Sequence, residues 1–210
     1  MRKVLMGFAF LWPGMLSAQE VVIAALGDSL TQGYGLVAQE GFVPQLQSWL
    51  DTQGAQVRLI NAGVSGDTTA GGLSRAAWTL TPDVDAMILA LGGNDLLRGL
   101  DPDVSRANLD GILKVAAEAD VEVLLVGMQA PGNFGPQYKA SFDAIYPELA
   151  KSYDTLLAPS FFAGISATND PIEARAFMQA DGIHPNAEGV AKIVAALGPE
   201  VLALVARAQE

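Results

Sequence analysis

The chain has 210 residues, none of which is cysteine and only one of which is histidine. The lack of cysteine excludes a thiolate nucleophile, an iron–sulfur cluster and any zinc site with cysteine ligands. A single histidine also cannot supply the two or three imidazoles that most catalytic zinc sites use. We therefore expect no metal and no cofactor. If the chain is an enzyme that uses imidazole, His184 is the residue that provides it.

Basic residues are also few, because 12 Lys and Arg stand against 23 Asp and Glu, for a formal net charge of −11. This charge repels a polyanion over most of the surface and argues against nucleic acid as a partner. Hydrophobic residues make up 50% of the chain. At this length one domain can bury a large core. We expect a soluble protein that acts as a monomer.

Residues 1–18 resemble a secretory signal peptide. A basic pair, Arg2-Lys3, precedes an apolar stretch from Val4 to Leu16, and Ala18 is a small residue before polar ones. The apolar stretch is too short to span a bilayer. We expect cleavage after Ala18, a periplasmic or secreted location, no membrane span after cleavage, and one domain over residues 19–210.

Apolar runs then alternate with amphipathic stretches, which is typical of an α/β domain with a parallel sheet covered by helices on both faces. Buried strands are predicted at Val21–Leu26, Val57–Ile60, Ala86–Leu91, Val121–Gly127 and Thr155–Ala158. Helices are predicted at Phe42–Thr52, Thr69–Trp78, Val104–Ala119, Tyr138–Ser152 and Ala187–Arg207. Ligands bind at the carboxyl ends of the strands in such sheets, so we expect the functional site there.

Ser29 follows the first strand in the segment Gly27-Asp28-Ser29-Leu30. A serine hydroxyl is a weak nucleophile and needs a base, usually an imidazole that a carboxylate orients. His184 can be this base, and Asp181 lies three residues earlier in the segment Asp181–Asn186. Each residue also has a plainer interpretation, since a serine after a strand often caps a helix and Asp-Gly is a strong turn signal.

An acyl-transfer site also needs hydrogen-bond donors for the oxyanion of its tetrahedral intermediate. Gly66, in the segment Gly63–Thr68, offers a backbone N–H that no side chain shields. Asn94, in the segment Gly92–Asp95, offers a side-chain amide. Seen alone, the two would be an ordinary turn glycine and turn asparagine.

These segments, in this order and spacing, resemble the four sequence blocks of the GDSL or SGNH hydrolases. Within that superfamily the chain is most similar to the bacterial periplasmic group of thioesterase I, protease I and lysophospholipase, often labelled arylesterase. The resemblance implies a flavodoxin-like three-layer sandwich around a five-stranded parallel sheet of order 2-1-3-4-5.

The resemblance also implies residue roles. Ser29 would be the nucleophile and an oxyanion donor through its own N–H, and Gly66 and Asn94 would complete the oxyanion hole. His184 would be the base, and Asp181 would orient it.

The resulting hypothesis is a serine esterase or thioesterase that forms an acyl-enzyme on Ser29. Its substrates would be aryl esters, acyl-CoA or lysophospholipids, some of them lipid-derived. The alternatives are a carbohydrate O-acetylesterase, a non-catalytic periplasmic binding protein, and a flavin or nucleotide carrier suggested by the fold alone. Apolar candidates for the walls of an acyl pocket are Phe134, Phe161, Phe162 and Met178.

Several other residues are predicted to be structural. We interpret Asp67, Asp95, Asp101 and Asp103 as turn and cap residues, because no oxygen-ligand loop pattern accompanies them. Trp49 and Trp78 lie on predicted helices and are expected in the core.

Overall fold

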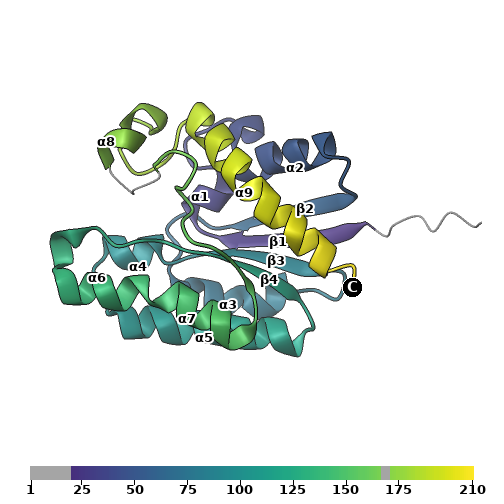
Figure 1. Cartoon of the computed structure of the whole chain (residues 1–210), viewed down its shortest axis with the longest axis horizontal. Coiled ribbons are helices and arrows are strands. Elements are labelled where there is room, and N and C mark those ends of the chain that lie inside the picture. The colour runs from purple at the N-terminus through teal and green to yellow at the C-terminus, as the bar shows by residue number, and fades with distance from the viewer. Residues whose placement is uncertain (1–19, 167–170) are drawn as a thin grey trace, which may run out of the picture.

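The computed structural model describes residues 20–166 and 171–210 (Figure 1). The predicted signal peptide lies outside the described residues and stays a prediction. The described chain alternates strands with helices from β1, which begins at Val21, to the long closing helix α9.

Five parallel strands form one sheet in the order β2-β1-β3-β4-β5, as the family resemblance implies. Gly27 at the end of β1 pairs with Gly63 at the end of β2, so the segments that follow these strands leave the sheet at the same level. β2 extends beyond the predicted Ile60 because it pairs with β1 along its full length. The strands are β1 (Val21–Gly27), β2 (Val57–Gly63), β3 (Ala86–Ala90), β4 (Glu122–Val126) and β5 (Leu156–Ala158).

Helices cover both faces of the sheet, which makes three layers (Figure 1). One face carries α1 (Ser29–Gln32), α2 (Phe42–Thr52) and α9 (Ala187–Arg207). The other face carries α3 (Thr69–Thr79), α5 (Pro102–Glu118), α6 (Pro136–Asp143) and α7 (Ile145–Tyr153). Shorter elements are α4 (Gly93–Leu97), α8 (Pro171–Ala174) and the 3₁₀ turns η1 (Ala38–Glu40), η2 (Gly132–Phe134) and η3 (Arg175–Phe177).

The helix predicted over Tyr138–Ser152 is wrong as a single helix, because two helices, α6 and α7, meet at Ala144. Pro147 explains the break. A proline has no N–H, so it cannot donate to the carbonyl four residues earlier, at Asp143, where α6 ends. Pro147 is tolerated in the first turn of α7, where N–H groups have no intrahelical partner.

The two tryptophans that were expected in the core differ. Trp49 on α2 is half-buried and packs against α9, where a Cβ added to Gly198 would lie 2.6 Å from the indole. Trp78 on α3 is 86% exposed, so its predicted core position is wrong. The buried residues of α3 include Gly72 and Ala76, four positions apart on one face of the helix, and Trp78 lies off that face.

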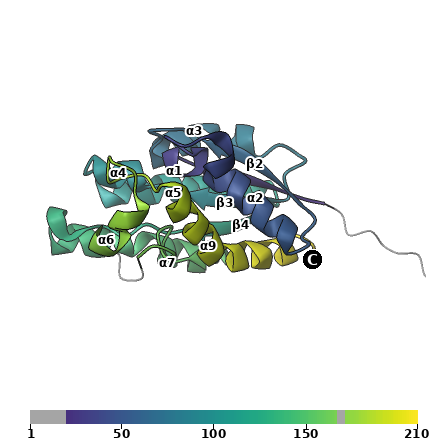
Figure 2. The ribbon, with the colours of Figure 1, turned by 90° about the horizontal axis from the view of Figure 1, so that it is seen from above.

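The closing helix α9 is long and apolar enough to cross a membrane by length and composition, with a mean hydropathy of 1.8 over its most apolar stretch. Half of that stretch is buried in the protein. Seen from above, α9 runs beside α2 over the sheet (Figure 2), and it contacts β3, β4 and β5. These are the properties of a core helix in an α/β protein.

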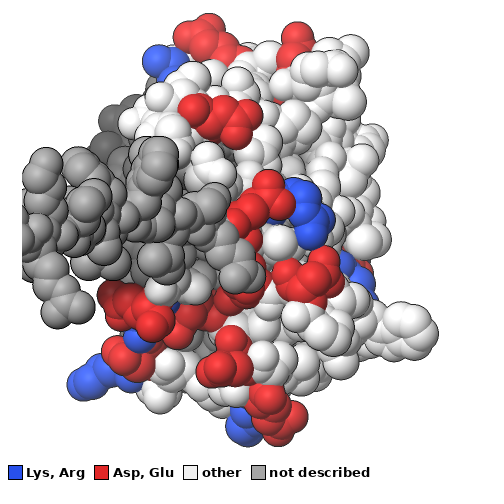
Figure 3. All heavy atoms as spheres, turned by 90° about the vertical axis from the view of Figure 1, so that its right-hand side faces the viewer, with Lys and Arg blue, Asp and Glu red and all other residues white. Residues whose placement is uncertain are grey.

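The negative charge is visible on the face toward which the amino-terminal ends of the strands point. Asp and Glu side chains gather there, with fewer Lys and Arg among them (Figure 3). A face of this charge repels polyanions. The segments that follow the carboxyl ends of the strands lie at the opposite end of the molecule (Figure 1).

Candidate active site

Ser29 lies at the sharp turn between β1 and α1. Asp28 is the N-cap of α1, and its carboxylate accepts a hydrogen bond from the N–H of Leu30 at 3.0 Å. Ser29 is therefore the first residue of a helix that begins where β1 ends, and it lies at the carboxyl edge of the sheet. The sequence analysis placed Ser29 directly after the strand but did not predict the helix, because four residues are too few to show a period.

His184 and Asp181 reach Ser29 from the loop before α9. The Nε2 atom of His184 lies 2.8 Å from the Oγ atom of Ser29, and the Nδ1 atom lies 2.7 Å from Oδ2 of Asp181. Oδ1 of Asp181 accepts the backbone N–H groups of Ile183 and His184 at 2.9 and 3.0 Å. The three side chains thus form one continuous chain of hydrogen bonds.

The hydrogen bonds to Asp181 also determine its charge. The bond with His184, followed by the two backbone N–H groups, lowers the pKa of Asp181 to about 2. An ionised Asp181 accepts a hydrogen bond from Nδ1–H of His184, so in neutral imidazole the proton stays on Nδ1 and Nε2 carries none. In this tautomer Nε2 can take the hydroxyl proton of Ser29.

Asn94 and Gly66 hold different positions relative to Ser29. Asn94 lies in the first turn of α4 and lines the same cavity as Ser29, and its Nδ2 donates to Oδ2 of Asp28 at 3.2 Å. Gly66, at φ +84°, lies on the loop after β2, outside the lining of that cavity. Its loop adjoins the end of β1 because the N–H of Val64 donates to the Gly27 carbonyl at 3.1 Å.

The sequence analysis did not identify Arg75 on α3, although its guanidinium connects three parts of the site. It donates to the Gly27 carbonyl at 2.8 Å, to the Ala62 carbonyl at 2.7 Å and to the Asp67 carboxylate at 2.7 Å. Arg75 therefore joins the ends of β1 and β2 to the loop that carries Gly66. Asp67 is the partner of this ion pair and not an ordinary turn residue.

Asp95, the neighbour of Asn94, is fully buried and likewise more than a turn residue. Its carboxylate accepts the N–H of Thr69 at 2.9 Å, the Thr69 hydroxyl at 2.5 Å and the Ser105 hydroxyl at 3.1 Å. This network connects α4 to α3 and α5. Asp101 is a helix cap as predicted, since it accepts the N–H of Asp103 at 3.0 Å at the start of α5.

Asp28, which precedes Ser29 in the chain, also carries a buried carboxyl group. Burial raises its pKa to about 6, although the hydrogen bonds from the N–H of Leu30 and from Asn94 act in the opposite direction. A charge that is removed from water disfavours the ionised form unless enough donors compensate for the lost hydration. Asp28 therefore titrates within the site, directly beside Ser29 in the chain.

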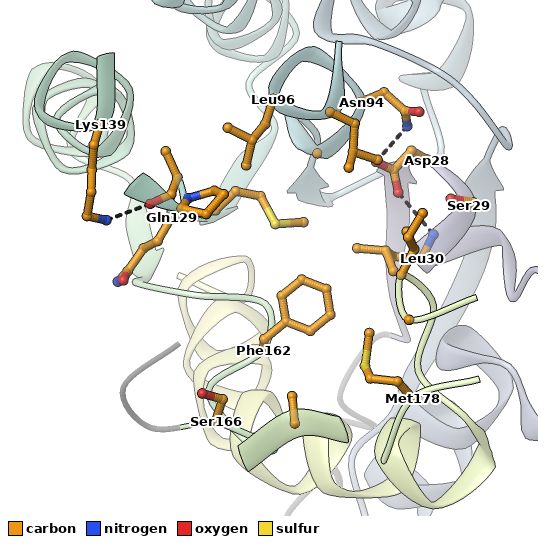
Figure 4. A pocket seen from close by; sticks show the side chains of 18 of the residues that line it. Asp28, Ser29, Leu30, Asn94, Leu96, Gln129, Lys139, Phe162, Ser166 and Met178 are labelled. Atoms are coloured by element: carbon orange, nitrogen blue, oxygen red, sulfur yellow. Dashed lines mark hydrogen bonds between the residues drawn. The ribbon is translucent and has the colours of Figure 1, made fainter. Parts of the chain in front are cut away.

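A cavity of about 570 Å³ opens beside Ser29 and Asn94. The side chains of Leu96, Phe162 and Met178 point into it, so its walls are largely apolar (Figure 4). Away from Ser29 it is bounded by Lys139, whose ammonium donates to the Ala130 carbonyl at 2.7 Å. Such a site suits an extended apolar group attached to a carbonyl at Ser29.

The predicted pocket residues are half right. Phe162 and Met178 line the cavity, whereas Phe134 and Phe161 do not. Phe161 is 1% exposed and packs against Phe42 in the core. Phe134 is 44% exposed and packs against Tyr138 at a ring-centroid distance of 5.0 Å.

Within the described ranges, no three His, Asp or Glu side chains gather in a way that could hold a metal ion. The chemistry at the site is accounted for by the hydroxyl, imidazole, carboxyl and amide groups named above. These are the groups of a nucleophilic acyl-transfer site.

Residues 25–192 match the GDSL-like lipase/acylhydrolase family. The chain belongs to this family. The matched range includes Ser29, Gly66, Asn94, Asp181 and His184, and it confirms the resemblance drawn from the four sequence segments.

Two relatives of this chain carry the names of an esterase and a thioesterase. Esterase TesA of Pseudomonas aeruginosa is 38% identical over 170 residues, which cover 80% of this chain and 81% of the relative. The "Thioesterase 1/protease 1/lysophospholipase L1" of Escherichia coli is 38% identical over 162 residues, or 77% of this chain and 74% of the relative. This GDSL hydrolase is therefore an enzyme of an esterase and acylhydrolase family.

A solved structure supports the same assignment. The crystal structure of AlinE4, an SGNH-hydrolase family esterase, superposes with a TM-score of 0.72 at 43% identity. The match covers 89% of this chain and 97% of AlinE4. The predicted flavodoxin-like sandwich is thus the fold of an SGNH hydrolase.

Proposed function

We propose that this GDSL hydrolase cleaves carboxylic esters or acyl thioesters through an acyl-enzyme on Ser29. The observation that carries the proposal is the chain of hydrogen bonds from Ser29 through His184 to Asp181 at the mouth of a largely apolar cavity. The cavity can hold the acyl group, and the chain of hydrogen bonds can activate the hydroxyl of Ser29.

In the acylation half-reaction, Oγ of Ser29 attacks the carbonyl carbon while its proton passes to Nε2 of His184. The ionised carboxylate of Asp181 stabilises the imidazolium that results. His184 then gives the proton to the leaving alcohol or thiol, and the acyl group stays on Ser29. Neutral imidazole is required at the first step, so we expect the rate to fall in acid.

The oxyanion of the tetrahedral intermediate would be bound by the N–H groups of Ser29 and Gly66 and by the amide of Asn94. Asn94 can act here without losing its bond to Asp28, since the amide nitrogen carries two hydrogens and Asp28 uses one. Removal of one oxyanion donor typically lowers kcat by about 10²–10³-fold.

The apolar cavity supports an acyl group longer than acetyl as the substrate. Each buried methylene contributes about 0.8 kcal/mol, so kcat/KM should rise about fourfold per added methylene until the cavity is full. A carbohydrate O-acetylesterase would show the opposite profile, with activity on acetate that is lost by hexanoate.

We also propose that the enzyme is exported and acts as a monomer on small-molecule esters, some of them lipid-derived. The basic, apolar and small-residue pattern of residues 1–18 supports export. The net negative charge supports the absence of a nucleic-acid partner.

The decisive experiment is labelling with a fluorophosphonate, which modifies activated serines. We expect one labelled residue, Ser29, and we expect Ser29→Ala to lose both labelling and hydrolysis of p-nitrophenyl butyrate. Retention of either property in the variant contradicts the proposal. A series of p-nitrophenyl esters, acyl-CoAs and lysophospholipids then separates the substrate classes, and no turnover of any of them would favour a binding protein.

A further inference from the structure

Asp181 and His184 lie on a short hairpin formed by residues 178–185. Met178 and Pro185 pair as an antiparallel bridge at its base, and the N–H of Gln179 donates to the His184 carbonyl at 2.8 Å. The hairpin is thus a unit in which the base and its orienting carboxylate move together. Its position relative to Ser29 depends on contacts with another part of the chain.

Among the described residues, two hydrogen bonds join this hairpin to the segment of residues 28–36, which contains the nucleophile. One is the bond between His184 and Ser29. The other runs from Nε2 of Gln179 to the backbone carbonyl of Tyr34, at 2.8 Å. The first of these bonds takes part in the reaction, whereas the second does not.

The amide of Gln179 is suited to join the two segments. Besides the Tyr34 carbonyl, Nε2 donates to the Pro185 carbonyl at 2.9 Å, so each of its two hydrogens reaches one segment. Gly35, at φ +76°, makes room for this amide, because a Cβ there would lie 2.2 Å from Oε1 of Gln179. Gly35 therefore allows the amide of Gln179 to lie close to the backbone of residues 34 and 35.

The side chain of Tyr34 adds a direct contact with the base. Its ring centroid lies 4.6 Å from that of the His184 imidazole, with the planes tilted by 36°. His184 contacts Tyr34 through this ring and Ser29 through Nε2, and its own side chain is 15% exposed. Loss of the Tyr34 ring would remove the contact that limits movement of the imidazole on that side.

These contacts matter most after Ser29 has been acylated. The Oγ atom is then an ester oxygen without a hydrogen, so Ser29 can no longer donate to Nε2 of His184. The Gln179–Tyr34 bond and the ring contact persist, because neither involves an atom that changes during the reaction. A displacement of about 1 Å in a catalytic group can cost about 10²-fold in rate.

We propose that Gln179 and Tyr34 are positioning residues that hold His184 over the acyl-enzyme during deacylation, an inference that rests on the proposed function. In this step water attacks the acyl carbon and gives a proton to Nε2 of His184. The tetrahedral intermediate collapses, the bond from carbon to Oγ of Ser29 breaks, and His184 returns the proton to Oγ. The acid is released and the free enzyme is restored.

The test is stopped-flow hydrolysis of p-nitrophenyl acetate by Gln179→Met, which keeps the length of the side chain and removes both N–H donors. The burst reports acylation and the later linear phase reports deacylation. We expect the rate constant of deacylation to fall about tenfold and that of acylation to fall less than about threefold. The tenfold fall is smaller than the roughly 10²-fold cost of a full 1 Å displacement. Steady-state kcat and KM should then fall together, with kcat/KM nearly unchanged.

A pair of Tyr34 variants tests the ring without altering the Gln179 bond, which uses the backbone of Tyr34. Tyr34→Phe keeps the ring and should retain the deacylation rate, whereas Tyr34→Leu should lower it. If Gln179→Met does not fold, this pair carries the test alone. Equal rates in Tyr34→Leu and Tyr34→Phe would contradict the role of the ring.

Gln47→Met is the matched control, because Nε2 of Gln47 also donates to a backbone carbonyl, that of Val57, at 2.9 Å. This bond lies near the amino end of β2, so the variant should lose stability and keep both rate constants. A parallel fall of acylation and deacylation in Gln179→Met, or no fall in either, overturns the inference. Failure of the proposed function is distinct, because Ser29→Ala would then still hydrolyse the ester.

Discussion

The side-chain amide of Asn94 donates to the carboxylate of Asp28 at 3.2 Å, while the other oxygen of that carboxylate accepts the N–H of Leu30 at 3.0 Å. Asp28 thereby joins α1, which begins at Ser29, to α4, which carries Asn94. The carboxylate is 2% exposed, and this burial raises its pKa to about 6. The carboxyl group that accepts from Asn94, the proposed oxyanion donor, therefore destabilises the fold when it ionises.

Asp28→Asn tests this conflict through the pH dependence of stability. A pKa that is higher in the folded than in the unfolded state makes stability fall as pH rises between the two values, here from about 4 to about 6. The free energy of unfolding of the wild type should thus fall by about 2 kcal/mol relative to the variant over this range. Urea unfolding from pH 4 to pH 7 measures the difference.

Other carboxyl groups titrate equally in both proteins and cancel in that comparison. A difference that does not change with pH would contradict the assignment to Asp28. The variant should also lose activity at every pH. The Asp28 carboxylate accepts from both the N–H of Leu30 and the amide of Asn94, whereas an amide at position 28 has one acceptor oxygen and turns an NH₂ group toward the other donor. Asn94 must then leave its position or remain unpaired there.

Asp181→Asn separates charge from geometry in the triad. An asparagine can still accept the backbone N–H groups of Ile183 and His184, but it carries no charge to stabilise the imidazolium. We expect kcat to fall by about 10²–10⁴-fold. Circular dichroism checks that the fold is retained, and an unchanged kcat would show that Asp181 does not orient His184.

The pKa of Asp181 also predicts how the fold responds to acid. Because hydrogen bonding with His184 lowers this pKa to about 2, the contribution of Asp181 to stability is present above pH 4 and is lost as pH falls toward 2. The contribution is small, since the side chain is 36% exposed. The wild type and Asp181→Asn should therefore differ little in stability at neutral pH and converge in acid.

Arg75→Met should destabilise the protein and lower kcat together. The guanidinium donates to two backbone carbonyls and one carboxylate, and these acceptors lose their partner in the variant. We expect a loss of more than about 2 kcal/mol in the free energy of unfolding, since hydrogen bonds of charged groups contribute about 1.5–3 kcal/mol each. The fall in kcat would come from displacement of the loop that carries Gly66.

Arg58→Met is the control for charge, because Arg58 forms exposed ion pairs with Glu20 and Asp83 near the amino ends of the strands. Exposed pairs contribute about 0–1 kcal/mol, so this variant should keep its stability and its activity. Equal effects of the two substitutions would mean that Arg75 acts only through its charge.

The sheet and the hydrogen-bonded set of Ser29, His184 and Asp181 could be predicted from the sequence because both leave local patterns. Buried parallel strands are continuous apolar runs, and Ser29 and His184 lie in short segments rich in glycine and polar residues. Arg75 and Gln179 leave no such pattern, because most of their partners are backbone carbonyls, which any residue can provide. Their roles depend on distances between segments far apart in the chain, which only the folded structure gives.

The two wrong predictions about the helices, the unbroken helix across Pro147 and the buried position of Trp78, also have local causes. Pro147 was visible in the sequence and marks the boundary between α6 and α7, yet the apolar pattern continues across it. Trp78 was expected in the core because it is apolar, although it lies off the buried face of α3. In each case a single residue departs from the trend of its neighbours.

The different positions of Phe161 and Phe162 could not be predicted from the sequence either. These adjacent residues have the same side chain, but Phe161 packs in the core and Phe162 lines the cavity. Phe162→Trp should fill part of the cavity and shorten the preferred acyl chain of p-nitrophenyl esters, with activity on acetate retained. Phe161→Leu should instead cost about 1–2 kcal/mol of stability and leave the chain-length profile unchanged. A profile that moves in Phe161→Leu and not in Phe162→Trp would place the acyl group elsewhere.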